Sequence, residues 1–180
     1  MRLHSWSALV AAIVGLAPNA LYLLVFLNGV EGSEAVYAGL IVLLLALPYI
    51  IAFGAAFSEQ AAYRTASLTA ALVAAIPPTL LLLAFFIGII LVPGVIALLV
   101  AAIRSGGEVR GLTKLGSFVV GVVAGVVLVI VWWPMITAYE PFYGSLSTEG
   151  VGTALGMVFV ALTGLWLTGT ALGRRSLMAA

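Results

Sequence analysis

The chain has 180 residues, of which 64% are hydrophobic and only 7% are charged, and its net charge is +1. Soluble domains carry about 25% charged residues, so this chain has too few to cover a water-facing surface, and its mean hydropathy of +1.31 indicates lipid as the main solvent. The sequence contains no cysteine, which excludes disulfides, thiolate metal sites and cysteine nucleophiles.

Four apolar segments are each long enough to cross the hydrocarbon core of a bilayer, which needs about 20 helical residues. They cover residues 5–27, 35–57, 115–137 and 151–172. A fifth apolar stretch, 65–103, is about 40 residues long. A straight helix of that length would measure about 60 Å, nearly twice the hydrocarbon thickness. We therefore expect two spans, 65–84 and 88–103, with a turn near Ala84–Gly88. A re-entrant hairpin that crosses only part of the membrane is the alternative.

The positions of the basic residues favour six spans over five. With six spans, all seven Lys and Arg residues fall on one side of the membrane, whereas five spans divide them five to two. Basic loops face the cytoplasm, so the sequence predicts one all-α transmembrane domain over 1–180, with six helices and both termini in the cytoplasm. The expected location is the plasma (inner) membrane of a prokaryote.

Small residues recur at four-residue intervals in two of the predicted spans. This spacing lets two helix backbones approach closely in lipid, so we expect packing within the bundle or a docking face for another subunit. The residues are Ser117, Gly121 and Gly125 in one span and Gly152 and Gly156 in the other.

Catalytic motifs are missing from the sequence. It has no aspartate, its single histidine is His4 near the N-terminus, and no metal-ligand or phosphate-binding motif occurs. All six glutamates fall outside the predicted spans, so no ionisable carboxylate is expected in the hydrocarbon region. We therefore expect no enzyme activity, no metal, no cofactor and no nucleic-acid partner, and a membrane enzyme is the third hypothesis.

Weakly polar side chains beside two prolines give the only candidate binding site. Asn19 follows Pro18, Tyr22 shares a helix face with Asn19, and Tyr49 follows Pro48. Kinks at Pro18, Pro48 and the Pro77-Pro78 pair would open an apolar crevice with Asn19 as its strong hydrogen-bonding group. The plainer interpretation is that Asn19 satisfies a carbonyl freed by a proline or bonds to a neighbouring helix.

These features predict a small non-enzymatic membrane protein, an accessory or structural subunit whose partners are the bilayer and another membrane protein or a second copy. The alternative is a solute-binding component of a transporter. Ala8 and Ala12 in the first span are similar to the Ala-x-x-x-Ala face of the substrate-binding components of energy-coupling-factor transporters, which have a similar size and six spans. That resemblance implies a solute site within the membrane domain.

Overall fold

The computed structural model describes residues 3–29, 33–83 and 87–137, and every regular element among them is helical. The elements are α1 (Trp6–Gly29), α2 (Ser33–Ala56), α3 (Ala61–Leu83), the 3₁₀ helix η1 (Ile87–Leu91), α4 (Val92–Gly107) and α5 (Gly111–Thr137). The predicted sixth span, 151–172, lies outside the described residues.

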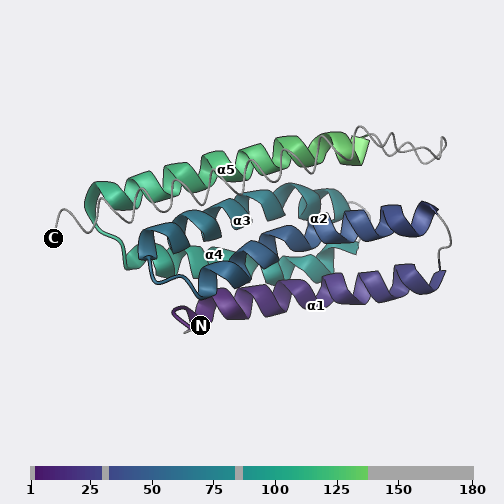
Figure 1. Ribbon diagram of the computed structural model, residues 1–180, viewed down its shortest axis with the longest axis horizontal. Helices are drawn as coiled ribbons and strands as arrows, with labels where there is room; N and C mark the ends of the chain where they lie inside the picture. The colour runs from purple at the N-terminus through teal and green to yellow at the C-terminus, as the bar shows by residue number, and fades with distance from the viewer. Residues whose placement is uncertain (1–2, 30–32, 84–86, 138–180) are drawn as a thin grey trace.

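Four of the helices form a closed ring. α1 contacts α2, α2 contacts α3, α3 contacts α4, and α4 returns to α1. α5 lies outside this ring and packs along α3, so α3 is covered on three sides (Figure 1). α3 therefore presents side chains to three neighbouring helices.

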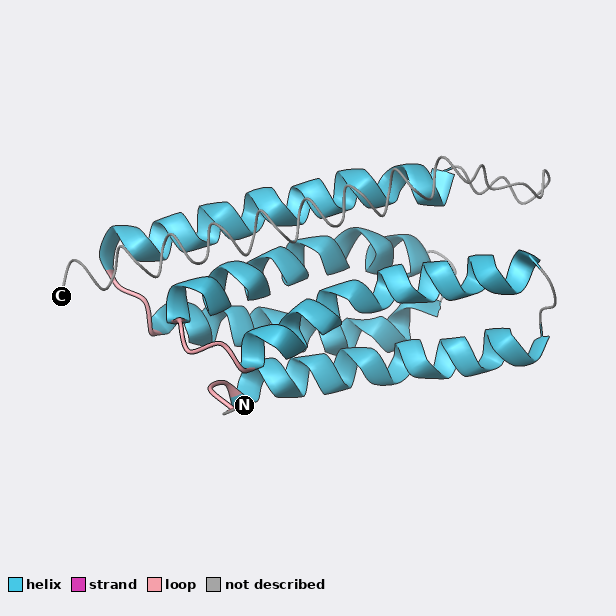
Figure 2. Ribbon diagram, in the orientation of Figure 1, coloured by secondary structure: helices cyan, strands magenta, loops and turns pink. Residues whose placement is uncertain are grey.

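The N-terminal residues and two loops lie at one end of the bundle, which we call the basic end. These loops cover residues 57–60 and 108–110 (Figure 2). The backbone N–H groups of His4 and Ser5 donate to Ala56 O over 2.9 and 3.0 Å, which fixes the start of α1 beside the end of α2. Successive helices therefore run in opposite directions, as short connections require.

The long apolar stretch 65–103 forms two antiparallel helical segments. α3 ends at Leu83, and η1 then runs back into α4. Gly88 makes this return possible, because a Cβ there would lie 2.4 Å from Leu83 N and 2.6 Å from Thr79 O. The chain thus doubles back directly over the end of α3, at a position where only glycine fits.

The prolines occupy two kinds of position. Pro18, Pro48 and the pair Pro77 and Pro78 lie inside continuous helices. Pro93 occupies the first turn of α4, where a missing N–H removes no helical hydrogen bond. It therefore marks the junction between η1 and α4 and does not interrupt a helix.

The buried and exposed residues are distributed in the opposite way to those of a soluble protein. Most buried apolar residues are alanines, accompanied by buried Ser, Thr and Asn side chains. Large aliphatic and aromatic side chains are exposed on all five α-helices. In water a protein with such a surface would aggregate. In lipid, large apolar side chains are about as stable facing outward as they are inside the protein.

Three helices of the described part are long and apolar enough to cross a membrane. The qualifying stretches are Trp6–Leu24, Gly88–Gly107 and Gly111–Ile130. A shorter apolar stretch, Val42–Ala56, lies in α2. α3 carries more hydroxyl side chains than these, because it occupies the centre of the arrangement.

α5 meets α3 at its small residues. A Cβ at Gly121 would lie 2.6 Å from both Ala66 O and Thr69 Cβ, and one at Gly125 would lie 2.6 Å from Val73 Cβ. Ser117, one turn earlier, is fully buried and donates its hydroxyl to Thr113 O over 2.7 Å. Gly152 and Gly156, the other candidate packing pair, lie outside the described residues.

Candidate functional site

Helices α1, α2 and α4 meet at the ring of Tyr49. This side chain extends from α2 and is only 2% exposed. A Cβ at Gly15 on α1 would lie 1.9 Å from Tyr49 Cδ1, and one at Gly94 on α4 would lie 2.8 Å from the Tyr49 hydroxyl oxygen. The two glycines therefore form the seat for the tyrosine ring, and the backbones of α1 and α4 also approach closely, with 3.0 Å between Gly15 Cα and the position of a Gly94 Cβ.

Asn19 lies one helical turn beyond Gly15 and is 2% exposed. Its side-chain Nδ2 donates to Gly15 O over 2.7 Å. Pro18 has no N–H, so the carbonyl of Val14, four residues earlier, loses its helical hydrogen bond. Asn19 does not satisfy this freed carbonyl. It bonds instead to the carbonyl of Gly15, which in a regular helix already accepts the backbone N–H of Asn19. The α1 backbone is therefore reinforced directly beside the Tyr49 ring.

Two polar atoms of this cluster are buried without a hydrogen-bond partner: Asn19 Oδ1 and the Tyr49 hydroxyl. Each such atom costs about 1–3 kcal/mol relative to a satisfied one. Tyr22, the third candidate, is half-buried and lies three residues beyond Asn19. Asn19 and Tyr49 therefore both contact Gly15, whereas Tyr22 lies towards the edge of the bundle interior.

The amide oxygen can accept a hydrogen bond, and the phenol O–H can donate one. They offer no nucleophile, no metal ligand set and no group that titrates near neutral pH. The cluster is therefore suited to binding or to fixing helix positions, and it carries no chemistry of acid–base catalysis. The described residues also contain no group of three or more His, Cys, Asp or Glu side chains that could hold a metal ion.

A second polar cluster, at the basic end, was not predicted from the sequence. Arg64 was expected in a loop before the third span, but α3 begins at Ala61, so Arg64 lies in its first turn and is 3% exposed. Its Nη2 pairs with Glu108 Oε2 beyond the end of α4, and its Nη1 donates to Ser58 O over 2.8 Å. One side chain therefore joins the start of α3, the 57–60 loop and the end of α4.

Hydroxyl groups continue this cluster inward along α3. Thr65 and Ser105 lie 3.0 Å apart through their hydroxyl oxygens and connect α3 to α4. Thr65 and Thr69 donate to carbonyls one turn back, Ala61 O and Thr65 O. Such bonds satisfy a hydroxyl within its own helix, which makes it tolerable in a bundle without water.

One signal in the sequence could have located the Arg64 pair. In the predicted topology, Glu59 and Glu108 are the two acidic residues on the side that holds all the basic ones, so each has basic residues with which it could pair. Glu59 lies 3.7 Å from His4, and Glu108 pairs with Arg64. No equivalent signal singled out Gly15 or Gly94 in the sequence.

No protein-family model, no curated protein and no solved structure matches this chain.

A Cβ at Gly15 should destabilise the bundle, because it would overlap the Tyr49 ring. We expect Gly15→Ala to lower the thermal unfolding midpoint in detergent by about 5 °C, the effect of overpacking by a few kcal/mol. The matched control is Gly54→Ala in α2, where a Cβ meets nothing within 4 Å. Equal midpoints for the two variants would show that Tyr49 does not rest on Gly15.

Proposed function

We propose that this chain is a non-enzymatic integral membrane protein of a prokaryotic plasma membrane, with six spans and both termini in the cytoplasm. We further propose that it acts as an accessory or structural subunit beside membrane partners. The supporting observation is the inverted distribution of side chains, with alanine, Ser, Thr and Asn inside and large aliphatic residues outside. Lipid is the solvent in which this arrangement is stable.

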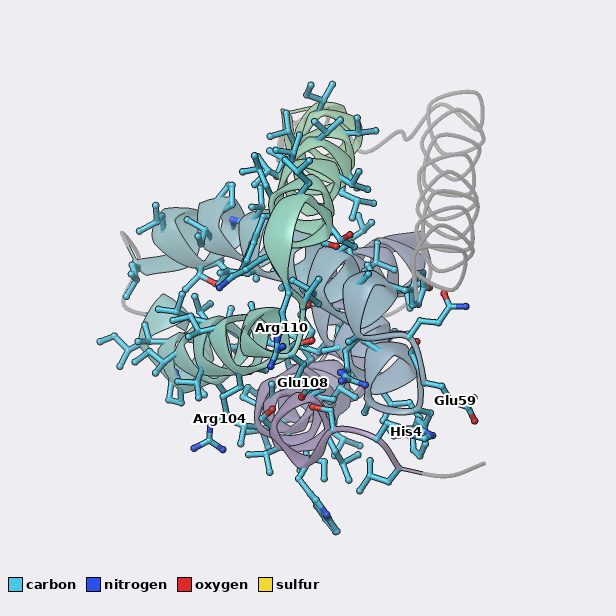
Figure 3. The ribbon with its side chains drawn as sticks, turned by 90° about the vertical axis from the view of Figure 1, so that its left-hand side faces the viewer. His4, Glu59, Arg104, Glu108 and Arg110 are labelled. Atoms are coloured by element: carbon cyan, nitrogen blue, oxygen red, sulfur yellow. The ribbon has the colours of Figure 1, made fainter. Side chains whose placement is uncertain are left out.

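The placement of charge supports the proposed orientation. Arg64, Arg104, Arg110 and Lys114 all belong to segments at the basic end, and Figure 3 looks onto that end and labels Arg104 and Arg110. These are all the basic residues of the described part. The positive-inside rule places such an end in the cytoplasm.

A subunit role fits the chemistry of the interior. The buried amide and phenol are held by helix packing, and no nucleophile with an adjacent base lies among the described side chains. A protein of this kind contributes shape and apolar surface, the two properties by which membrane subunits assemble. A membrane enzyme, the third hypothesis, gains no supporting observation.

The alternative function, a solute-binding transporter component, keeps one supporting feature and loses another. The Asn19–Tyr49 cluster would offer one hydrogen-bond acceptor and one donor to a largely apolar solute. Ala8 and Ala12, however, are both 0% exposed and belong to the packed core of the ring. These two alanines therefore pack inside the bundle, and their spacing adds no support for the alternative.

Reporter fusions test the proposed topology. A reporter fused at Gly107 and another fused after Ala180 should both be active in the cytoplasm, and one at Gly144 should be active only outside. The reason is the positive-inside rule applied to seven basic residues on one side. An external reporter at Gly107 or after Ala180 would contradict the six-span arrangement.

The subunit role has its own test. Native mass spectrometry of the chain, released from its own membrane by a mild detergent, should give a complex heavier than the chain's 18.6 kDa. A mass that includes a second polypeptide identifies a hetero-partner, and a multiple of 18.6 kDa identifies a second copy. The chain alone, at 18.6 kDa under conditions that preserve other membrane complexes, would contradict the proposal.

A further inference from the structure

Three exposed cations surround the turn between α4 and α5. Arg104 lies in the last turn of α4, Arg110 lies in the turn itself, and Lys114 lies in the first turn of α5. All three are exposed, and neither of the two ion pairs among the described side chains involves them. We call these three residues the cationic patch.

The carboxylate nearest to the patch along the chain is already paired. Glu108 lies between Arg104 and Arg110 in the sequence, and its Oε2 is bound by Arg64. The Arg64 side chain is 4% exposed and that of Glu108 is 53% exposed. A buried guanidinium gives up a well-placed carboxylate only at high free-energy cost, so Glu108 is held by Arg64 and is not free to pair with the patch.

The helix dipoles increase the demand for an anion. Arg104 is stabilised by the negative C-terminal end of α4, but Arg110 and Lys114 flank the positive N-terminal end of α5. The first turn of α5 contains no acidic residue. Arg110 and Lys114 are repelled by the positive end of α5, and an external negative charge would be attracted by both of these cations.

Large apolar side chains lie next to the cations in the sequence. Ile103, Leu112 and Leu115 are 62%, 87% and 63% exposed. They alternate with Arg104 and Lys114 at the basic end of the two apolar helices. This juxtaposition of exposed cations with exposed aliphatic groups is complementary to a molecule with an anionic head and hydrocarbon tails.

We propose that the cationic patch binds the headgroups of anionic phospholipids in the cytoplasmic leaflet. This inference rests on the proposed membrane placement and adds a ligand class to it. Arg104 and Arg110 lie apart in Figure 3, Arg104 outside α4 and Arg110 nearer the centre of the bundle end, so they contact separate headgroups and do not clasp one phosphate. Ile103, Leu112 and Leu115 contact the adjoining acyl chains, which selects a lipid over free phosphate.

The test compares lipid binding to the purified full chain and to two triple variants. The first variant, Arg104→Gln with Arg110→Gln and Lys114→Gln, removes the charge. The second, Arg104→Lys with Arg110→Lys and Lys114→Arg, retains it. Native mass spectrometry in detergent gives the apparent Kd for phosphatidylglycerol and for phosphatidylcholine with the same acyl chains.

We expect the neutral variant to bind phosphatidylglycerol about a hundredfold more weakly at low ionic strength, or about fivefold for each charge removed. The charge-retaining variant should bind within a few-fold of the original chain, and phosphatidylcholine should bind all three proteins equally weakly. The proposal fails if the neutral variant keeps its affinity for phosphatidylglycerol. It also fails if the original chain binds both lipids alike, or if inorganic phosphate alone binds the patch as tightly as phosphatidylglycerol does.

Two controls separate this proposal from its premise. Raising the salt concentration on the original chain should weaken phosphatidylglycerol binding without any substitution, which tests the patch even if the neutral variant does not fold. Binding that does not depend on salt would contradict the proposal.

Resistance of each variant to extraction from membranes by alkaline carbonate reports the membrane placement separately. A chain that resists extraction but does not discriminate between the lipids refutes the patch alone.

Discussion

The arrangement of this protein depends on the close approach of helix backbones at small residues. In the proposed lipid setting, large apolar side chains gain little by being buried, so helix association must come from van der Waals contact and hydrogen bonds between helices. Gly15 and Gly94 seat the Tyr49 ring between three helices, and Gly121 and Gly125 admit the α3 backbone and Val73 against α5. At each of these positions a single added methyl group would meet a heavy atom within 3 Å.

Polar groups in the interior follow from the same constraint. Three threonines on α3 and Ser117 on α5 donate their hydroxyls to carbonyls of their own helix, which lets these groups be buried without another partner. Arg64 is the exception, because it reaches across to Glu108 and to Ser58 O and so ties three segments at the basic end. The Asn19–Tyr49 cluster has two buried polar atoms without a partner, Arg64 Nε and the Ser67 hydroxyl are likewise buried without one, and packing alone does not explain these atoms.

The helices themselves were largely predictable from the sequence, but most of the faces by which they meet were not. Each of the first five predicted ranges coincides with a helix over most of its described residues, and the doubling back within 65–103 followed from its length and from the charges on either side. The boundaries differ where polar residues lie at helix ends: α3 begins at Ala61, so it includes Arg64, and α1 continues to Gly29, so it includes Asn28 as a second amide. Apolarity alone does not mark where a helix emerges from lipid.

The candidate site was predictable only in part, for a related reason. Asn19 and Tyr49 stood out because polar residues are rare in apolar spans, and both are buried. Gly15 and Gly94, which position them, did not stand out among twenty glycines. In a soluble helix the apolar stripe identifies the inward face, but these helices are apolar on all sides, so no periodic signal shows which glycine meets which neighbour.

The central claim is that the bundle lies in lipid with its small residues inward, and α5 tests it most directly. Because the chain has no cysteine, a single introduced cysteine can carry one spin label at Val119, Val123, Val126, Ser117 or Leu128 in reconstituted bilayers. Labels at the three valines, which are exposed, should collide with oxygen dissolved in the bilayer and not with a water-soluble nickel chelate. Labels at Ser117 and Leu128, which are buried, should collide with neither. Strong collision of the valine labels with the nickel chelate, or equal oxygen collision at Leu128 and Val123, would contradict the account.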